Sequence, residues 1–178
     1  MQDLILDFFN KTKSFLIKHR ITIAFFYAGL LTLFLVFSFF FRPVVVSGSS
    51  MLPTLNNNET ILIKRNVSVD EIKRGDIIVF HSPLNRGKLL IKRVVAVGGD
   101  KVAIINGNVY VNGKLLQEPY LNRVKSHETI PLLRVPKNSF YVLGDNRVIS
   151  SDSREFGCVG FKEIYGKLVF AGEKSSIK

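Results

Sequence analysis

The distribution of apolar and polar residues divides the chain into three parts. Residues 1–20 alternate apolar with basic side chains, which is typical of a short amphipathic helix on a membrane surface. Residues 21–41 carry no charge and are bounded by Arg20 and Arg42. At about 1.5 Å of rise per residue, this run is roughly 31 Å long as a helix, enough to cross a bilayer core. We therefore predict a surface segment, 1–20, followed by one transmembrane helix, 21–41.

From residue 42 onward the pattern changes to short β-rich runs separated by turns. Strands are expected at 44–46, 60–63, 76–80, 89–91, 93–97, 101–105, 108–111, 140–143 and 167–170. Asn106-Gly107 and Asn112-Gly113 indicate two tight turns, the first of which closes a hairpin. Residues 114–138 show weak periodicity and contain prolines, which favours an extended excursion. Residues 42–178 are therefore predicted to form a mainly β domain, a barrel or a sandwich.

The composition narrows the range of partners and cofactors. The net charge of +11 suits either nucleic acid or an anionic lipid surface. The basic residues are spread along the chain without an arginine-rich block or zinc-finger spacing, so we expect membrane lipids and no nucleic acid. The single cysteine, Cys158, excludes an internal disulfide and a cysteine metal cluster. We expect neither a metal nor a cofactor.

The apolar run has a competing interpretation as a cleaved secretory signal, with Ser47-Gly48-Ser49 as the cleavage site. The run is longer than the roughly 7–15 residues typical of such a signal, which favours a permanent anchor. The basic residues before the helix and the long domain after it favour a cytoplasmic N-terminus. The domain 42–178 is then expected on the far side of the membrane.

Residues 46–55, Val-Ser-Gly-Ser-Ser-Met-Leu-Pro-Thr-Leu, are the first candidate for chemistry. They place hydroxyl-bearing residues between an apolar run and a Met-x-Pro-Thr turn, where one serine oxygen can be held exposed. We interpret Ser50 as a nucleophile, although such a cluster is more often only a solvated turn. A serine nucleophile requires a base, because its hydroxyl is weakly nucleophilic near neutral pH.

Histidine is the usual base, and the chain has three. His19 lies on the wrong side of the membrane under the predicted topology. His81 and His127 remain open as members of a triad with Asp145 or Asp152, since triads are assembled in space rather than in sequence. No nucleophile-elbow sequence surrounds Ser50, which weakens this alternative.

Lys92 is the other candidate base. Strand alternation turns Leu90, Lys92 and Val94 toward one face, so the lysine shares an apolar face. It is either an edge residue whose amine reaches water, which is the commoner case, or a buried amine with a lowered pKa. Moving a lysine pKa from about 10.4 to about 7.5 takes about 4 kcal/mol, which burial without a carboxylate partner can supply.

Four stretches together resemble the four successive boxes of bacterial type I signal peptidases, the Ser/Lys-dyad leader peptidases. They are Ser50–Thr54, Arg74–Phe80, Ile91–Val94 with Gly99-Asp100 following, and Gly144–Arg154. Their order, their spacing and the preceding apolar run all agree with that family. The resemblance covers about residues 43–170, and four matched boxes are far more specific than any single one.

The resemblance implies a role for each matched residue and a β-rich catalytic domain of the signal-peptidase type. Ser50 is implied as the nucleophile, Lys92 as the general base, and Ser150 as the residue that hydrogen-bonds and orients the lysine amine. The implied supporting residues, which hold the last box through ion pairs and hydrogen bonds, are Asp145, Arg147, Asp152 and Arg154. The implied pocket residues are Val46, Met51 and Ile91.

The chain departs from the family pattern at two places. Many members carry serine two positions before the nucleophile, where its hydroxyl helps to hold the oxyanion, but this chain has Gly48. The Ser50 backbone N–H remains one oxyanion donor, and a Gly48 backbone group or a water is the candidate second donor. Val148 and Ile149 are apolar where polar residues are frequent, so this loop is expected to pack more tightly or to touch lipid.

The resemblance implies a protease of the bacterial cytoplasmic membrane that removes signal peptides from exported preproteins. The secretion translocon is a candidate partner. One rival is an autoprotease like the self-cleaving repressors of the DNA-damage response, which share a Ser-Met start but need no anchor. The other rival is an anchored, non-catalytic β-domain that binds exported proteins, which would bind them equally well with Ser50→Ala.

Overall fold

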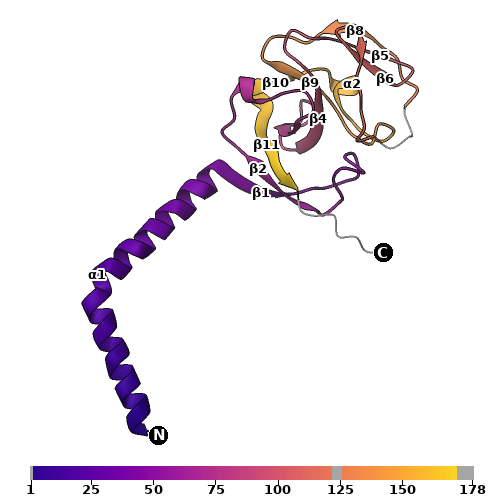
Figure 1. The fold of residues 1–178 in the computed structure, drawn as a ribbon. Coiled ribbons are helices and arrows are strands. Elements are labelled where there is room, and N and C mark those ends of the chain that lie inside the picture. The colour runs from indigo at the N-terminus through magenta and orange to yellow at the C-terminus, as the bar shows by residue number, and fades with distance from the viewer. Residues whose placement is uncertain (1, 122–125, 172–178) are drawn as a thin grey trace. The chain divides into compact units, whose positions relative to one another are not determined.

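The computed structural model describes residues 2–121 and 126–171 and divides the chain into two units after Phe40. The helices and strands, labelled as in Figure 1, are α1 Gln2–Phe40, β1 Phe41–Val45, β2 Thr60–Lys64, η1 Val69–Glu71, β3 Ile77–His81, β4 Leu89–Val97, β5 Lys101–Ile105, β6 Asn108–Val111, β7 Lys114–Leu115, β8 Ile130–Arg134, β9 Ser139–Leu143, α2 Ser153–Phe156, β10 Val159–Gly160, η2 Phe161–Glu163 and β11 Ile164–Ala171. The prediction of a mainly β domain after one N-terminal helix is confirmed.

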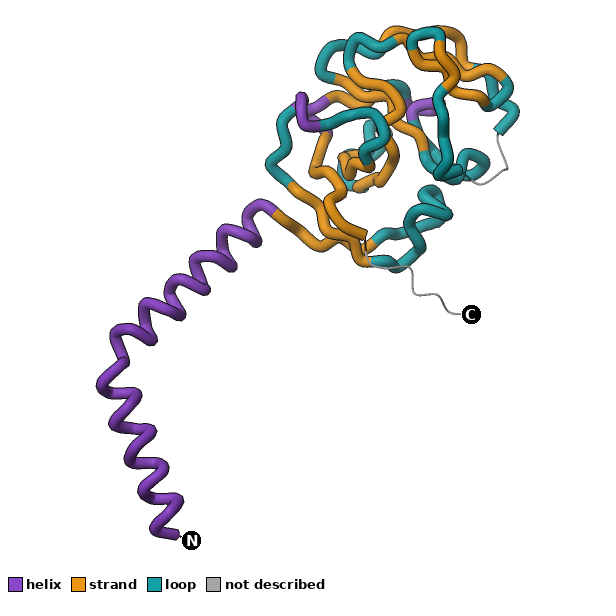
Figure 2. The backbone as a smooth tube through the Cα atoms, in the orientation of Figure 1, coloured by secondary structure: helices purple, strands orange, loops and turns teal. Residues whose placement is uncertain are grey.

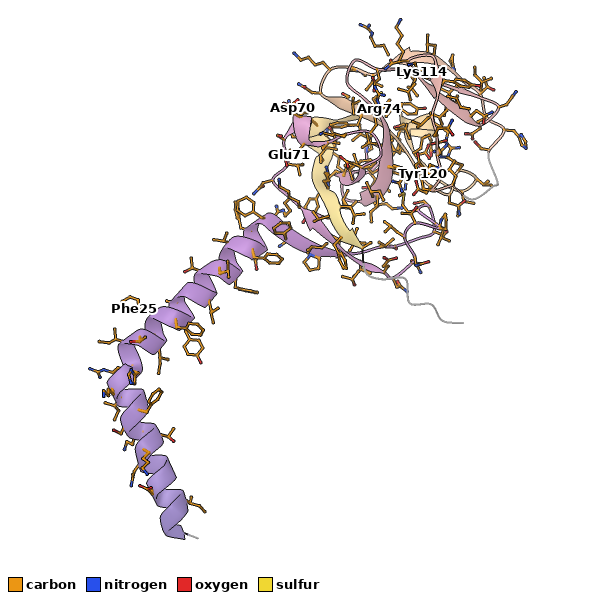
Figure 3. All side chains as sticks on the ribbon, viewed as in Figure 1. Phe25, Asp70, Glu71, Arg74, Lys114 and Tyr120 are labelled. Carbon is orange, nitrogen blue, oxygen red and sulfur yellow. The ribbon has the colours of Figure 1, made fainter. Side chains whose placement is uncertain are left out.

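Helix α1 is continuous, so the predicted boundary between 1–20 and 21–41 is not a helix boundary. The helix ends at Phe40 and Phe41 begins β1, because Pro43 forces the residue before it out of the helical conformation. Ile17–Phe40 is long and apolar enough to cross a membrane, with a mean hydropathy of 2.3 and no burial within the structure. Its side chains project freely from the helix, as Phe25 does in Figure 3.

Seven strands form one sheet in the order β1-β2-β11-β3-β4-β9-β10, in which every neighbouring pair is antiparallel. Figure 2 shows the strands of the domain in orange, with loops between them in teal. The two runs predicted at 89–91 and 93–97 are one nine-residue strand, β4. A register shift between Val94 and Ala96 marks where β4 bends against β9. Four antiparallel steps separate β1 from β4, so these two strands run in the same direction.

A second sheet contains four strands in the order β7-β6-β5-β8. The predicted hairpin is present, since Asn106 and Gly107 both have positive φ and connect β5 to β6, as a type I′ turn requires. Strand β8 was not predicted, because the excursion 114–138 lacks alternation there and contains Pro131. Proline is tolerated because β8 lies at the edge of its sheet. The excursion also includes 122–125, which lie outside the described residues.

The hydrophobic core of the β domain has three clusters, and one of them lies beneath the Ser50 segment. Met51 and Leu55 are 1% and 0% exposed and belong to this cluster, together with Val46 and strand residues of β2 and β3. Burying each such side chain contributes about 1.5–3 kcal/mol. The apolar residues on both sides of Ser50 therefore fix the segment while the serine itself stays at the surface of the core.

Candidate active site

The segment that carries Ser50 is held in place by its backbone as well as by its buried side chains. The Ser50 carbonyl oxygen accepts from the Asn146 N–H at 2.9 Å, and the Leu55 N–H donates to the Met51 carbonyl oxygen at 2.9 Å. The Ser50 N–H makes no hydrogen bond within the described residues. Ser50 is half-buried and lines a cavity.

Lys92 lies on β4 and is 3% exposed. Its amine nitrogen Nζ is 2.7 Å from Ser50 Oγ and donates to the Ile91 carbonyl oxygen at 2.9 Å. Burial lowers the pKa of the Lys92 ammonium from 10.5 to about 8. Lys92 is therefore a buried amine with a lowered pKa, and not an edge residue whose amine reaches water.

Nearby charges act on Lys92 in opposite directions. Asp152 and Asp145 favour the charged amine, whereas Lys88 disfavours it. Both carboxylates are engaged by arginine. Arg154 Nε donates to Asp152 Oδ1 at 2.8 Å, and Arg93 binds Asp145 through two parallel hydrogen bonds of 2.8 and 2.6 Å. These arginines offset the carboxylates, so desolvation remains the larger influence on the amine.

The histidines make no contact with Ser50 within the described residues. His81 Nδ1 lies 3.0 Å from the Arg86 carbonyl oxygen, and His127 is exposed. His19 belongs to α1. Neither His81 nor His127 hydrogen-bonds Ser50 in the part of the chain that the structure describes. The base within reach of the Ser50 hydroxyl is Lys92.

The last box folds back against β9 through buried polar contacts. Asp152 is fully buried, caps the short helix α2 and accepts from the Gly144 N–H at 3.0 Å. Arg154 also reaches Glu128 at 2.7 Å and the Ser150 carbonyl oxygen at 3.2 Å. These bonds hold the two ends of the loop together.

Sequence reasoning missed a second set of charged partners. Arg147 pairs with Glu118 across a buried contact, with side chains 3% and 6% exposed. Tyr120 donates its hydroxyl to Glu118 at 2.9 Å, and its ring lies 3.9 Å from the Arg93 guanidinium carbon. Thr54 donates to Asp145 at 2.5 Å. Residues 116–121, in the weakly patterned excursion, thus connect the Lys92 strand to the last box.

Ser150 does not make the implied hydrogen bond to the lysine amine. Its Oγ is buried and has no hydrogen-bond partner within the described residues. The amine instead contacts Ser50 Oγ and the Ile91 carbonyl oxygen. Ser150 packs against Gly144, where any added Cβ would overlap the serine side chain.

The Gly48 N–H, a candidate for the second oxyanion donor, is not free to take that role. That N–H donates to Asn57 Oδ1 at 2.8 Å and is therefore occupied. Gly48 has a φ of +97°, a conformation that glycine adopts readily and that a serine would adopt only with strain. The positive φ at position 48 therefore explains why this chain has glycine where many family members have serine.

Ser50 and Lys92 both line a cavity of about 540 Å³. One wall comes from 44–50 and the other from 88–92, with Val46 and Ile91 among the lining residues. Met51 was expected in the pocket but is absent from its lining, because its side chain is buried in the core beneath the segment. Within the described range, no group of three His, Cys, Asp or Glu side chains could hold a metal ion.

Comparison with known proteins gives a consistent result. Residues 18–172 match the family described as "Signal peptidase, peptidase S26". The chain is 40% identical over 146 residues to signal peptidase I of Bacillus caldolyticus, which covers 74% of this chain and 79% of that protein. It is 35% identical over 156 residues to signal peptidase IB of Staphylococcus aureus strain Mu50, covering 78% and 81%. A solved signal peptidase I from Enterococcus faecalis V583 covers 55% of this chain and 96% of that one, with 32% identity and a TM-score of 0.49.

Proposed function

Because the chain belongs to the signal peptidase family, peptidase S26, we propose that Ser50 and Lys92 are the dyad with which it cleaves its substrates. The chain is a serine endopeptidase of the signal peptidase I type, and its substrates are proteins that carry signal peptides. The observation that supports this dyad is the buried amine 2.7 Å from the serine hydroxyl.

The first half of the reaction forms an ester. Neutral Lys92 takes the hydroxyl proton of Ser50 as Oγ bonds to the carbonyl carbon of the scissile peptide. The Ser50 N–H donates to the developing oxyanion, since no other group competes for it in the described residues. The Lys92 ammonium then returns its proton to the leaving amine nitrogen, the C–N bond breaks, and the signal peptide stays as an ester on Ser50.

The second half restores the enzyme. Water attacks the ester carbonyl carbon while Lys92 accepts a proton from that water. The C–O bond to Ser50 breaks, and the lysine proton passes to Oγ. The signal peptide leaves as a carboxylic acid, which releases its proton to the solvent, and the dyad returns to its starting protonation.

The substrate binds as an extended strand between the two walls of the cavity. Strand β1 is the last strand of its sheet, so one edge of residues 44–45 is unpaired within the described residues, and β4 pairs with β9 only from Arg93 onward. Both edges therefore offer backbone groups to an added strand. Val46 and Ile91 narrow the cavity near Ser50, which favours small side chains such as the alanines of an Ala-x-Ala site.

The anchor places this chemistry at the membrane. Residues 21–41 span the bacterial cytoplasmic membrane once, with residues 1–20 in the cytoplasm and residues 42–178 outside. The net charge of +11 favours contact with anionic headgroups, and the preprotein is received from the secretion translocon.

Cleavage of a purified preprotein by the full chain in detergent micelles tests the dyad. Ser50→Ala, Lys92→Met and Lys92→Arg should each lose cleavage by about a thousandfold or more. Lys101→Met, an exposed lysine on the other sheet, is the matched control and should cleave normally. Wild-type kcat/KM should fall about tenfold per pH unit below about 8, because only the neutral amine is a base. Full activity of Lys92→Met would reject the dyad.

A further inference from the structure

The cavity at Ser50, which we call the cleft, is lined by one lysine that the proposed reaction does not use, Lys88. Among the residues that line the cavity only Lys88 and Lys92 ionise, and no carboxylate lines it. Lys92 must be neutral to act as a base, so Lys88 carries the fixed charge of the cleft. The two amines are within electrostatic range, since the Lys88 charge contributes to the lowered pKa of Lys92.

The Lys88 backbone is fixed while its side chain is unengaged. The Lys88 N–H donates to the Asn85 carbonyl oxygen at 2.9 Å, and its own carbonyl oxygen accepts from the Ser82 N–H at 2.8 Å. Lys88 is exposed, and its ammonium has no hydrogen bond or ion pair within the described residues. A substrate carboxylate would therefore meet an available donor rather than displace an existing partner.

The strand directions define which part of a substrate reaches Lys88. Because β1 and β4 run in the same direction, moving back from Ser50 toward Val44 also moves back from Lys92 toward Lys88. Val44 follows the last residue of α1 by four positions, so this end of the cleft is tethered to the membrane-crossing segment. A signal peptide has its apolar segment upstream of the cleavage site, and that segment belongs in the membrane. The upstream residues therefore lie toward Lys88.

The spacing between Lys88, which immediately precedes β4, and Lys92 gives the substrate position. Lys88 is four residues before Lys92, which is about 13 Å at about 3.3 Å per residue. An extended substrate advances by the same amount per residue, so the matching position is about four or five residues before the scissile bond. This part of a signal peptide follows the apolar segment and is polar, so a charged residue can stand there.

We propose that Lys88 selects substrates by charge, favouring an acidic residue over a basic one about four or five positions upstream of the cleaved bond. This specificity rests on the proposed function, since it assumes that cleavage occurs at Ser50. The energy is that of a partly exposed ion pair, so the expected preference is about fivefold in kcat/KM for Asp over Lys. It should shrink in roughly 1 M salt, where the screening length is about 3 Å.

The test compares preproteins that share one Ala-x-Ala site and differ only in carrying Asp, Asn or Lys at the fourth or fifth upstream position. A second series carries the same residues at matched positions after the scissile bond. The enzymes are the full-length wild type, Lys88→Met, Lys88→Glu and the control Lys101→Glu, all in a non-ionic detergent. The readout is the Asp-to-Lys ratio of kcat/KM at one pH, because a changed Lys92 pKa acts equally on both substrates and cancels.

The wild type and Lys101→Glu should prefer Asp, Lys88→Met should show a ratio near one, and Lys88→Glu should prefer Lys. An unchanged ratio in Lys88→Glu, or a charge effect confined to the second series, overturns the proposal while leaving the Ser50 dyad intact. Cleavage of the Asn substrate by each variant reports that the variant is folded and active. Undiminished cleavage by Ser50→Ala would instead reject the proposed function, and this inference with it.

Discussion

The buried Lys92 amine has a consequence for stability that is independent of catalysis. In the unfolded chain this lysine ionises near its ordinary pKa of 10.5, whereas in the folded domain burial lowers the pKa to about 8. At about 1.4 kcal/mol for each tenfold change in proton affinity, the difference corresponds to about 3 kcal/mol. Folding at pH 7 therefore works against the charge of this single side chain.

The sign of the pH dependence follows from which state holds the proton. Below about pH 8 both states are protonated, so the penalty on the folded state is constant. Between about pH 8 and 10.5 the unfolded chain holds the proton and the folded domain has released it. The free energy of unfolding that Lys92 contributes therefore rises with pH through this window and levels off above it.

The comparison of wild type with Lys92→Met isolates this effect. Between pH 7 and 10.5, the free energy of unfolding of the wild type should rise by about 3 kcal/mol relative to that of the variant. Guanidinium unfolding of the detergent-solubilised chain can be followed by far-UV circular dichroism, because the chain has no tryptophan and tyrosines ionise near pH 10. Lys101→Met, which removes an exposed lysine, is the control.

Parallel curves for wild type and Lys92→Met across this range would refute the reasoning. They would mean that Lys92 keeps an ordinary proton affinity in the folded domain. The mechanism would then lack its neutral base near physiological pH.

Three further predictions concern the surroundings of the dyad. Gly144→Ala should reduce kcat by about 100-fold, because a Cβ there would lie 2.7 Å from the Ser50 carbonyl oxygen and displace the nucleophile; wild-type turnover would contradict this. Asn57→Ala should lower kcat/KM about fivefold, because it removes the hydrogen-bond acceptor of the Gly48 N–H. Asn57→Asp keeps an acceptor and should leave kcat/KM unchanged. Equal losses of steady-state cleavage in the two variants would reject a positioning role for Asn57. Glu118→Gln should destabilise the domain by about 3 kcal/mol in guanidinium unfolding, because it leaves the buried Arg147 charge without its carboxylate partner. The double variant Glu118→Gln with Arg147→Met should recover part of this loss. Additive losses in the double variant would count against the pair.

Local pattern accounts for most of the elements in the domain. Runs of β-branched residues predicted the long strands, and Asn-Gly predicted the type I′ turns, because strand alternation and positive φ depend on neighbouring residues alone. The local pattern failed to predict a strand where the neighbouring residues do not alternate between apolar and polar. Strand β8 contains Pro131 and lacks alternation, and it is a strand because β5 offers it an edge.

The candidate site was likewise predicted in part from the sequence and in part seen only in the structure. A serine in a Ser-Met-x-Pro-Thr stretch and a lysine on an apolar strand are visible in the chain itself, and the resemblance to a known family connected them. Whether the lysine was buried or reached water was undecided, because burial depends on what other strands cover it. The pairing of Glu118 with Arg147 was equally invisible, since the two residues are far apart in sequence and neither has a local pattern.

Residue order therefore defined the long apolar helix, the strands and the candidate dyad, since these depend on hydrophobicity and backbone preference within a few residues. Tertiary structure alone brought Lys92 Nζ to 2.7 Å from Ser50 Oγ and occupied the Gly48 N–H. It also left the Lys88 ammonium without a partner among the residues that the structure describes. Desolvation and ion pairing depend on every atom around a charge, and those atoms come from segments up to about a hundred residues apart. A lysine becomes a base through that surrounding, which no local stretch of sequence contains.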